Sequence, residues 1–420
     1  MNASAHPFQE DGATAQMGDS PRRRYATSGD LGRALAIDDL RARTHRLMPR
    51  FVLEYLEGGA GAEETLTRER EAYREWLFMP HTLVDESHRD LARAIIGKPA
   101  KMPLLVGPTG LNGLFRHGAD MSLAIASAKF GVPFIQSTMS NERMEDIAKV
   151  RGLRHWWQLY LFGPDAIWQS LVDRADACGC EALVLTTNSQ IFGERLWSSR
   201  TRIDGGSPSL ATILDAACHP RWLATTLNHG MPAFANVIDY VPKDKRGFFE
   251  SAFWIREQMP KTLSWTDVAK IRKRWKKPLF IKGILNLEDV TRSLTSGVDG
   301  IILGSHGGRQ ADASVSALDI LPRARELVGN HLSLFMSGGI RTGSHLLKAL
   351  ALGADAIVAG RAPLYGLCAG GRAGVSRALQ ILHDDALNEL GQLGVSSLDK
   401  LGADILVRRR QLPLAAGEGP

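Results

Sequence analysis

The sequence predicts a closed barrel of eight parallel strands that alternate with helices, the (β/α)8 or TIM barrel, and three observations lead to this fold class. Short apolar runs bounded by turn residues recur along the chain, as expected for strands that are buried on both faces. Amphipathic segments of helix length separate most of these runs. The number of strand–helix units is eight, which is the number a closed barrel needs. An open doubly wound sheet is the alternative, and the count favours the barrel.

The predicted elements follow one another at short intervals. Strands are expected at residues 103–107, 132–137, 156–161, 182–187, 278–283, 298–304, 332–337 and 355–360. Helical patterns such as those at 120–130, 265–275 and 344–352 lie between them. Before the first strand a helical pattern begins at Ile37, and the pair Gly58-Gly59 ends it. We therefore expect an N-terminal helical extension in front of the barrel.

The remaining segments set the domain organisation. Residues 1–30 are rich in small and polar residues without periodicity and are expected to form a mobile leader. The barrel is expected to occupy residues 31–405, and residues 406–420 a C-terminal tail. Strand four ends near Asn188, but the next helix begins near Ser264, which is too far for a simple loop. The insert, residues 189–262, is therefore interpreted as a lid, a substrate wall or an interaction segment.

Composition excludes several classes of protein. With 44% hydrophobic and 23% charged residues, the chain is typical of soluble globular proteins. The net charge of +6 is small and no basic stripe is interleaved with aromatic residues, so no nucleic-acid partner is expected. We expect no signal peptide, no membrane-spanning helix and no metal site, and the four cysteines match no disulfide framework. A cytoplasmic, reducing location is the simplest interpretation.

In a (β/α)8 barrel the active site lies at the carboxyl ends of the strands. Reading those ends in order gives Gly107-Pro108-Thr109-Gly110, Gln136-Ser137, Gln158 with Tyr160, Thr186 with Asn188 and Arg195, Lys282, His306 with Arg309, Ser337-Gly338-Gly339 with Arg341, and Gly360-Arg361. The last two groups indicate phosphate binding, because barrels often hold phosphate after strands seven and eight. The segments "SGGIRTG" and "AGR" supply backbone amides next to glycine, and two guanidinium groups.

The other strand ends suggest a ring and an acid. The polar side chains of Gln136, Gln158 and Thr186 can hydrogen-bond a polar ring edge, and Lys282 can place positive charge against an electron-accepting ring. Arg309 can hold a carboxylate, and His306 can take a proton near neutral pH. A phosphate-bearing flavin, a carboxylate clamp and a base together predict oxidation of a 2-hydroxy acid.

Several long motifs in order carry a family resemblance. They are "YLEGGAGAEETL", "GPTGLNG", "WQLYLF", "FIKGI", "SHGGRQAD", "SGGIRTG", "ALALGADAIVAGR" and "PLYGL". Between about Ile37 and Leu401 the chain resembles the FMN-dependent 2-hydroxy acid oxidising family of glycolate oxidase and the lactate and mandelate dehydrogenases. The segments "GPTGLNG" and "HPRWLATTLNHGMPAFANV" resemble the bacterial (S)-mandelate dehydrogenase branch.

The resemblance implies roles toward the substrate. His306 would be the base, and Arg309 and Arg195 would hold the carboxylate. Tyr55 and Tyr160 would bond the carboxylate or the hydroxyl group. The implied reaction converts an (S)-2-hydroxy acid, aromatic or bulky as mandelate is, to the 2-oxo acid, with electrons passed to quinone or another carrier.

The resemblance also implies FMN as the cofactor. Its ring would contact Ser137, Gln158 and Thr186, with Lys282 near one edge, and its phosphate would contact Arg341, Gly360 and Arg361. The backbone at Pro108, Thr109 and Gly110 would lie against one face of the ring, and Ser337, Gly338 and Gly339 would complete the cofactor site. Glycine at position 110, rather than alanine, is similar to the dehydrogenase members and suggests slow reaction with oxygen.

This sequence departs from the family pattern around the site. Asn188 stands where the family has an aspartate that stabilises the cationic histidine. Ser337 stands where the family has an aspartate that bonds the ribityl hydroxyls, and "RLWSSR" at 195–200 replaces "RExDxR". Our hypothesis is that the barrel is kept while the substrate or the reaction has shifted. The alternative function is therefore an FMN oxidase of a tailored pathway intermediate.

The insert resembles the segment that docks on the membrane in the bacterial branch. Its aromatic residues are Trp197, Trp222, Phe234, Phe248, Phe249 and Trp254, and its basic ones include Lys243, Lys245 and Arg246. A membrane or quinone contact, with a peripheral place on the inner face of the cytoplasmic membrane, and a lid or subunit contact are both open. The resemblance implies a homotetramer. A barrel that serves as a scaffold with little catalysis is a further alternative, against which His306, Arg309, Lys282 and Tyr160 argue.

Overall fold

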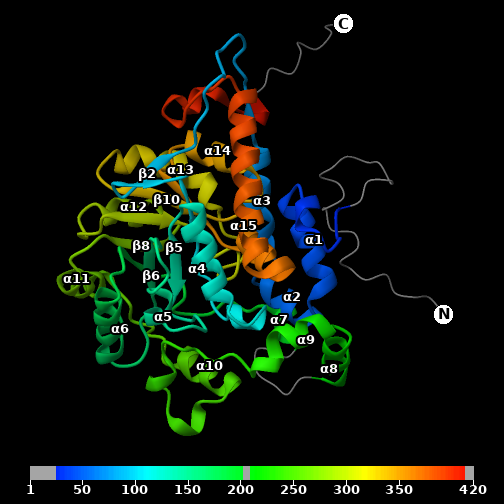
Figure 1. Ribbon diagram of the computed structural model, residues 1–420. Coiled ribbons are helices and arrows are strands. Elements are labelled where there is room, and N and C mark those ends of the chain that lie inside the picture. Colours follow the sequence, from blue (N-terminus) through cyan, green and yellow to red (C-terminus); the bar gives the residue numbers. More distant parts are fainter. Residues whose placement is uncertain (1–24, 202–208, 412–420) are drawn as a thin grey trace, which may run out of the picture.

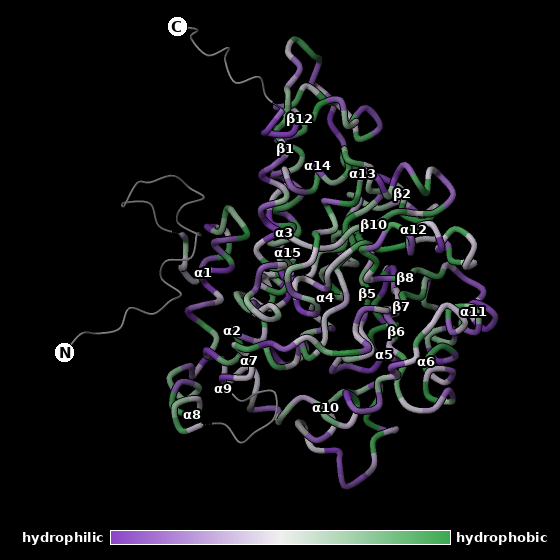
Figure 2. The backbone as a smooth tube through the Cα atoms, turned by 180° about the vertical axis from the view of Figure 1, so that it is seen from behind, coloured by the Kyte–Doolittle hydropathy of each residue, from purple (hydrophilic) through white to green (hydrophobic). Residues whose placement is uncertain are grey.

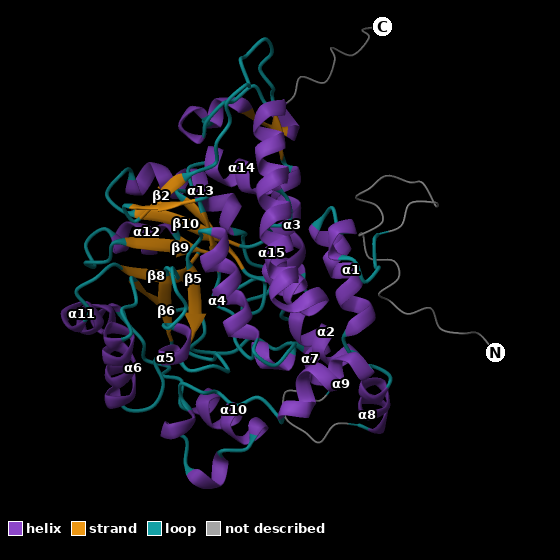
Figure 3. Cartoon of the chain, in the orientation of Figure 1, coloured by secondary structure: helices purple, strands orange, loops and turns teal. Residues whose placement is uncertain are grey.

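A computed structural model describes residues 25–201 and 209–411 of the chain. Eight parallel strands close into a barrel surrounded by helices (Figures 1 and 3). In chain order they are β4 (Leu104–Val106), β5 (Phe134–Ser137), β6 (His155–Leu159), β7 (Ala182–Thr186), β8 (Leu279–Ile284), β9 (Gly300–Leu303), β10 (Ser333–Ser337) and β11 (Ala356–Ala359). β11 pairs with β4 and closes the ring. All eight predicted strands are present, and the barrel prediction is confirmed.

Helices follow the strands as the rhythm of the sequence predicted. They are α4 (Ala119–Phe130), α5 (Met144–Ile147), α6 (Asp165–Ala177), α11 (Trp265–Arg274), α12 (Leu287–Ser293), α13 (Ala317–Val328), α14 (Gly343–Ala351) and α15 (Arg361–Gln392). α15 begins directly after β11 and bends at Gly370–Gly371, where the backbone leaves helical geometry. Its long second half lies against α1 and α4 (Figure 1).

The N-terminal extension is helical but not continuous. The pattern that begins at Ile37 gives two helices, α1 (Ile37–Leu47) and α2 (Arg50–Glu57). Pro49, the residue before α2, has no backbone N–H to continue the first helix. α3 (Glu64–Arg74) follows, and it brings its buried face to the ends of β9 and β10. The hairpin of β2 (Arg93–Ile95) and β3 (Lys98–Ala100) precedes the barrel.

Both ends of the described chain are tied to the barrel domain. The predicted leader lies mostly outside the described residues, but Ser28 and Gly29 at its end accept hydrogen bonds from Arg43 of α1. The predicted tail begins with β12 (Leu406–Arg408), which pairs antiparallel with β1 (Trp76–Phe78). Residues 406–408 therefore belong to the folded domain, and residues 412–420 lie outside the described part.

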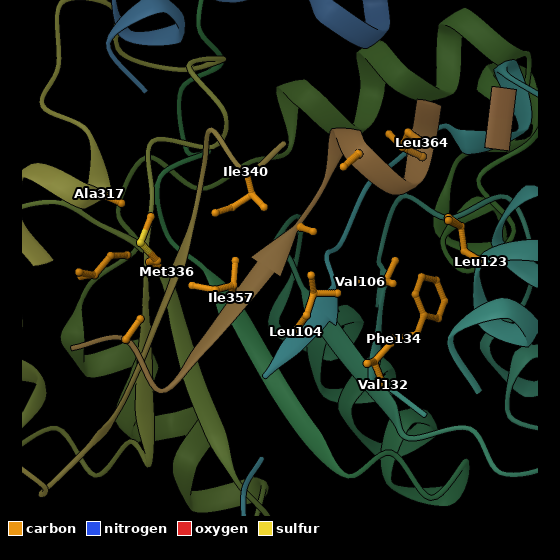
Figure 4. Packing of buried hydrophobic residues seen from close by; sticks show 14 of the residues in the cluster. Leu104, Val106, Leu123, Val132, Phe134, Ala317, Met336, Ile340, Ile357 and Leu364 are labelled. Carbon is orange, nitrogen blue, oxygen red and sulfur yellow. The ribbon is translucent and has the colours of Figure 1, made fainter. Parts of the chain in front are cut away.

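The core has two layers separated by the strands. Inside the barrel, the aromatic rings of Trp156, Phe280 and Phe335 pack together with centroids 5.0 to 6.1 Å apart. Outside it, strand residues such as Leu104 and Ile357 pack with Leu123 of α4 and Leu364 of α15 (Figure 4). Full burial on both faces is the reason that the strand sequences are continuously apolar.

The insert after β7 forms its own set of helices. These are α7 (Leu196–Arg200), α8 (Leu210–Ala217), α9 (Pro220–Thr226) and α10 (Phe248–Glu257), with short 3-10 turns between α9 and α10. α8 and α9 lie at the periphery, and α10 lies below the barrel (Figures 1 and 2). None of the described helices is long and apolar enough to cross a membrane.

Candidate active site

A layer of small and polar residues tops the hydrophobic interior of the barrel. Side chains of a strand alternate between its two faces, so the residue two positions after an interior residue points inward again. The interior residues include Leu105, Ile135, Trp156, Val184, Phe280, Ile302, Phe335 and Val358. Two positions later stand Gly107, Ser137, Gln158, Thr186, Lys282, Gly304, Ser337 and Gly360. Glycine and polar residues leave room and hydrogen-bonding groups at this end of the barrel.

A cavity of about 320 Å³ opens above this layer. The predicted site residues that line it are Tyr55, Pro108, Thr109, Gly110, Ser137, Tyr160, Arg195, Lys282, His306, Arg309, Ser337, Gly338, Gly339, Arg341, Gly360 and Arg361. Three others stand behind the lining: Gln158 and Thr186 are buried in the polar layer, and Asn188 contacts His306. The structure thus brings these residues to one end of the barrel. The prediction for Gln136 was wrong, because this side chain does not line the cavity and donates to Ser140 Oγ at 2.8 Å and to Glu142 O at 2.9 Å.

A tight turn after β9 carries His306 into the cavity. His306, Gly307 and Gly308 have positive φ angles of 61°, 71° and 70°. A side chain at position 308 has no room, because its Cβ would lie 2.7 Å from the backbone of Leu66 in α3. Ser305 Oγ accepts a hydrogen bond of 2.8 Å from Gly308 N and closes the turn. The left-handed conformation of a histidine is uncommon and indicates a functional position.

The hydrogen bonds of Asn188 fix the tautomer of His306. Asn188 Nδ2 donates to Gly304 O at 3.3 Å, so its Oδ1 faces His306 Nδ1 at 3.2 Å. Because that oxygen can only accept, Nδ1 carries the proton and Nε2 presents its lone pair. Tyr160 Oη lies 3.5 Å from Nε2. Burial, and then the charges of Lys282 and the nearby arginines, hold the pKa of His306 well below its usual value.

Two arginines stand next to the histidine. Arg309 donates through Nη1 to Tyr55 O at 2.7 Å and to Gly58 O at 2.9 Å, and its Cζ lies 5.1 Å from the Tyr55 ring. Arg195 Nε donates to Arg309 O at 3.5 Å. Tyr55 Oη donates to Gly110 O at 3.1 Å. These contacts anchor two cations and one phenol on the wall of the cavity that faces His306.

The polar layer also holds a buried lysine and a hydrogen-bonded pair. Lys282 is 6% exposed, and burial lowers its pKa to about 8. Ser137 Oγ donates to Gln158 Oε1 at 2.8 Å, which directs the Gln158 Nε2 group away from Ser137. Gln158 Nε2, Thr186 Oγ1 and Thr109 Oγ1 are buried and have no hydrogen-bond partner within the described chain. Such orphaned polar atoms are costly unless a ligand satisfies them.

The two arginines after β10 and β11 are held differently. Arg361 donates to Leu56 O, Glu57 O and Gly307 O at 3.1, 3.2 and 2.9 Å, so its hydrogen bonds join the end of α2 to the His306 turn. Arg341 donates through Nη1 to Ile340 O at 2.7 Å and lies over the Tyr365 ring. α15 begins at Arg361, so the first N–H groups of a long helix also face this end of the cavity.

Two features of the cavity were not among the predicted site residues. Glu69 of α3 is 2% exposed and lines the cavity beside Gly338. The insert adds a wall that comprises Phe192, Phe234, Ala252, Phe253, Ile255 and Arg256. Glu69 lies in a helix of the N-terminal extension, so a search of the strand ends does not find it. The sequence of the insert has no regular hydrophobic period. The helical spacing of Glu69 with Thr65, Ala72 and Tyr73, which are all buried, is the one signal that could have drawn attention to it.

Comparison with known proteins decides the family. A family model described as FMN-dependent dehydrogenase matches residues 44–408. The chain belongs to the FMN-dependent dehydrogenase family. An (S)-mandelate dehydrogenase of Pseudomonas putida is 38% identical over 88% of this chain and 93% of its own length. An L-lactate dehydrogenase of Ectopseudomonas mendocina is 33% identical over 89% of this chain and 99% of its own.

Solved structures agree with this family of FMN-dependent dehydrogenases. A crystal structure of the monotopic membrane protein (S)-mandelate dehydrogenase matches with a TM-score of 0.85 and 37% identity, over 89% of this chain and 99% of that one. A mandelate oxidase mutant with bound (S)-mandelic acid matches with a TM-score of 0.74 and 29% identity, over 89% and 98%. The protein is thus an FMN-dependent enzyme that oxidises a 2-hydroxy acid.

The residues present fit FMN, the cofactor of the family. The unpartnered atoms of Thr109, Gln158 and Thr186 can meet the polar edge of its ring, and Lys282 supplies the adjacent positive charge. Arg341 and the start of α15 stand where a phosphate would need cations and N–H donors. The polar layer therefore presents one end suited to a ring and another suited to a phosphate.

Proposed function

We propose that the enzyme oxidises an (S)-2-hydroxy acid with an aromatic or bulky side chain, such as mandelate, to the 2-oxo acid. The observation that carries this proposal is that His306, whose Nε2 lies 3.5 Å from Tyr160 Oη, lines one cavity with Arg195 and Arg309. Beyond them the insert contributes an apolar wall that includes Phe192, Phe234 and Phe253. A carboxylate at the arginines would direct the rest of the acid toward this wall.

In this proposal Arg309 and Arg195 hold the substrate carboxylate, and Tyr55 and Tyr160 complete its hydrogen bonds. Burial raises the pKa of Tyr160 to about 12, so the phenol stays a donor across the working pH range. Arg309 is anchored by two backbone carbonyls and can meet a carboxylate without a large loss of side-chain entropy.

Oxidation of the acid removes one hydrogen from the α-carbon, one hydrogen from the hydroxyl oxygen and two electrons in total. His306 Nε2 accepts one of these hydrogens as a proton. FMN, when bound, supplies the acceptor for the two electrons. Lys282 stabilises negative charge that develops on the ring. Asn188 Oδ1 and Ser189 Oγ lie 3.2 and 3.4 Å from His306 Nδ1, and neither contributes a negative charge. The cationic histidine would therefore meet neutral dipoles at this nitrogen.

The experiment is an anaerobic visible spectrum of the purified flavoprotein before and after addition of (S)-mandelate, lactate and glycolate. We expect (S)-mandelate to bleach the flavin bands fastest, because the insert wall favours an apolar ring. Bleaching by lactate or glycolate alone would reject the aromatic substrate but keep the reaction. A yellow protein that none of the three bleaches would favour the second candidate, an oxidase of a tailored pathway intermediate, which the replacement of two family aspartates by Asn188 and Ser337 supports.

We also propose that α8 contacts a membrane surface and that electrons leave to quinone. Leu210, Ile213 and Leu214 are 79%, 50% and 67% exposed, and their spacing puts them on one helical face. Two of the insert's aromatic residues, Trp222 and Phe234, are buried and do not serve this surface. The side chains of Phe248 and Phe249 lie outside the described residues.

Co-sedimentation with vesicles that contain phosphatidylglycerol tests the α8 surface. The double variant Leu210→Ser/Leu214→Ser should lose vesicle binding, while Leu83→Ser, which removes a fully exposed leucine elsewhere, should not. Unchanged binding of the double variant would reject the membrane role of α8. Loss of a dimer or tetramer in sedimentation, without a change in vesicle binding, would assign α8 to a subunit contact instead.

A further inference from the structure

Glu69 is the one carboxylate among the described residues that line the cavity. The cations in the same lining are Arg195, Arg256, Lys282, Arg309, Arg341 and Arg361. A buried carboxylate is costly to keep unless it is paired or hydrogen-bonded. Glu69 is 2% exposed and comes from a helix outside the barrel, so its position in the cavity requires an explanation.

The fold builds a place for this side chain. Ser305 Oγ donates to Glu69 Oε1, and the same Ser305 closes the His306 turn. A Cβ at position 338 would lie 2.5 Å from Glu69 Oε1, so only glycine lets the carboxylate lie against the end of β10. One turn later on α3, Tyr73 Oη donates to Gly338 O at 2.9 Å and fixes the helix against the same strand end. The carboxylate is therefore positioned by both α3 and β10.

Glu69 stands between the two ends of the cofactor site. Burial raises the pKa of Glu69, and the Ser305 hydroxyl and the charges of Arg361, Arg341 and Lys282 oppose that rise. Lys282 belongs to the ring end, and Arg341 belongs to the phosphate end. In FMN the ribityl chain, with its hydroxyl groups, connects the ring to the phosphate. No hydrogen bond from the described residues reaches Glu69 Oε2, so one oxygen is available as an acceptor.

The neighbouring serine does not supply this acceptor. Ser337 Oγ donates to Leu303 O at 3.2 Å, which turns the hydroxyl toward the adjacent strand. A Cβ at position 304 would lie 2.2 Å from that oxygen, so the serine packs tightly between β9 and β10. The site thus has the short side chain of Ser337 at the end of β10 and the longer side chain of Glu69, which extends from α3.

We propose that Glu69 accepts a hydrogen bond from a ribityl hydroxyl of the flavin, so that in this chain the carboxylate for the sugar-alcohol part of the cofactor comes from α3 and not from the end of β10. The alternative is that Glu69 only balances the charge of Arg341 and Arg361. The proposal depends on FMN binding and not on which acid is oxidised, so a flavin titration tests it separately from the proposed function.

Titration of the apoprotein with FMN and with riboflavin, followed by flavin fluorescence, distinguishes the two roles. Riboflavin has the ribityl hydroxyls but lacks the phosphate. If Glu69 binds a hydroxyl, Glu69→Gln should weaken the binding of both flavins by the same factor, about 10-fold or more, since a hydrogen bond to a charged group is lost. Arg341→Gln should weaken FMN alone. A change for FMN alone in Glu69→Gln, or no change for either flavin, would overturn the proposal.

Three further variants guard against a folding defect. Glu71→Gln changes an exposed glutamate of the same helix and should bind both flavins as the wild type does. Ser337→Asp, introduced into Glu69→Gln, should restore the binding of both flavins, because it returns a carboxylate to the same end of the site. If Glu69→Gln does not fold, Glu69→Asp withdraws the carboxylate but keeps its charge, and it should weaken both flavins equally. An unchanged affinity in Glu69→Asp would also reject the hydroxyl contact.

Discussion

His306 Nδ1 lies 3.2 Å from Asn188 Oδ1, so the catalytic candidate is oriented by an amide instead of a carboxylate. The amide fixes the same tautomer that a carboxylate would fix, but it does not stabilise a cation. Four neighbouring positive charges, those of Lys282, Arg195, Arg309 and Arg361, add to burial and lower the pKa of His306. The histidine is thus a neutral base over most of the pH range and a weak one.

Asn188→Asp is expected to strengthen that base. A carboxylate at this distance raises the pKa of a histidine by about 1 to 3 units. The acid limb of the profile of kcat/KM against pH should therefore move to higher pH, because the base is lost by protonation earlier on acidification. Above that limb, turnover should rise by roughly 10-fold. Asn330→Asp adds the same charge at an exposed position and should leave the profile unchanged. An acid limb that stays in place in Asn188→Asp would show that His306 is not the group that the profile reports.

Removal of the base is the second prediction. His306→Asn should slow the reduction of bound flavin by substrate by about 10²- to 10⁴-fold, the usual contribution of a general base. FMN affinity should be kept, because the ring nitrogens of His306 contact Tyr160 and Asn188. Stopped-flow absorbance under anaerobic conditions measures the rate, and fluorescence measures the affinity. The exposed His331→Asn is the matched control. Equal rates in His306→Asn and wild type would favour a barrel with no catalytic use of this histidine.

Lys282 should set the reduction potential of the flavin. Its positive charge at the ring end stabilises the reduced, anionic ring, so Lys282→Met should lower the midpoint potential. Burial lowers the pKa of Lys282 to about 8, so the wild-type lysine loses its charge as the pH rises through that value. The difference in potential between wild type and Lys282→Met should therefore shrink above pH 8. Dye-coupled potentiometry measures it, with the exposed Lys276→Met as the control. A difference that is constant across this pH range would exclude the charge as the cause.

Strand periodicity explains why so much of this site could be predicted. Each strand places an inward side chain every second residue. Because Trp156 and Phe280 point into the barrel, Gln158 and Lys282, two positions later, are expected to point inward at its open end. The strand-end rule then assembles residues that are far apart in sequence. Such reasoning needs only local pattern and a known architecture.

The residues that the sequence did not reveal come from outside this pattern. Glu69 contacts Ser305, which is 236 positions away in the sequence, and nothing in the local sequence of α3 shows which strand end Glu69 faces. Phe253 and Arg256 reach the cavity from α10, which sits in an insert without regular period. The break between α1 and α2 was readable, since Pro49 cannot donate the hydrogen bond that a continuous helix needs. Long-range packing, rather than secondary structure, limited how much of the site could be predicted from the sequence.

Two neighbouring acids beneath the loop after β4, the buried Asp120 and the half-buried Glu142, give the last prediction. Asp120 accepts hydrogen bonds from Asn112, Ser140 and Asn141, and its own backbone N–H donates to Glu142 Oε2 at 2.8 Å. With Asp120 satisfied as a carboxylate, burial and its negative charge raise the pKa of Glu142. Glu142 therefore keeps its proton in the folded protein at a pH where the unfolded chain has released it.

The sign of the resulting pH dependence follows from linkage. A raised folded pKa stabilises the fold fully below the pKa of the unfolded glutamate, and this contribution is lost as the pH rises toward the folded value. Urea unfolding of the apoprotein between pH 5 and 9 should show falling stability in the wild type. Glu142→Gln imitates the protonated side chain and should flatten that fall, with the variant more stable than the wild type at the alkaline end. Glu145→Gln is the opposite control, because Arg174 lowers the pKa of Glu145 to about 2 and the loss of this carboxylate should destabilise the fold throughout. Parallel curves for wild type and Glu142→Gln would mean that Glu142 is ionised in the native state and that the two acids do not share a proton.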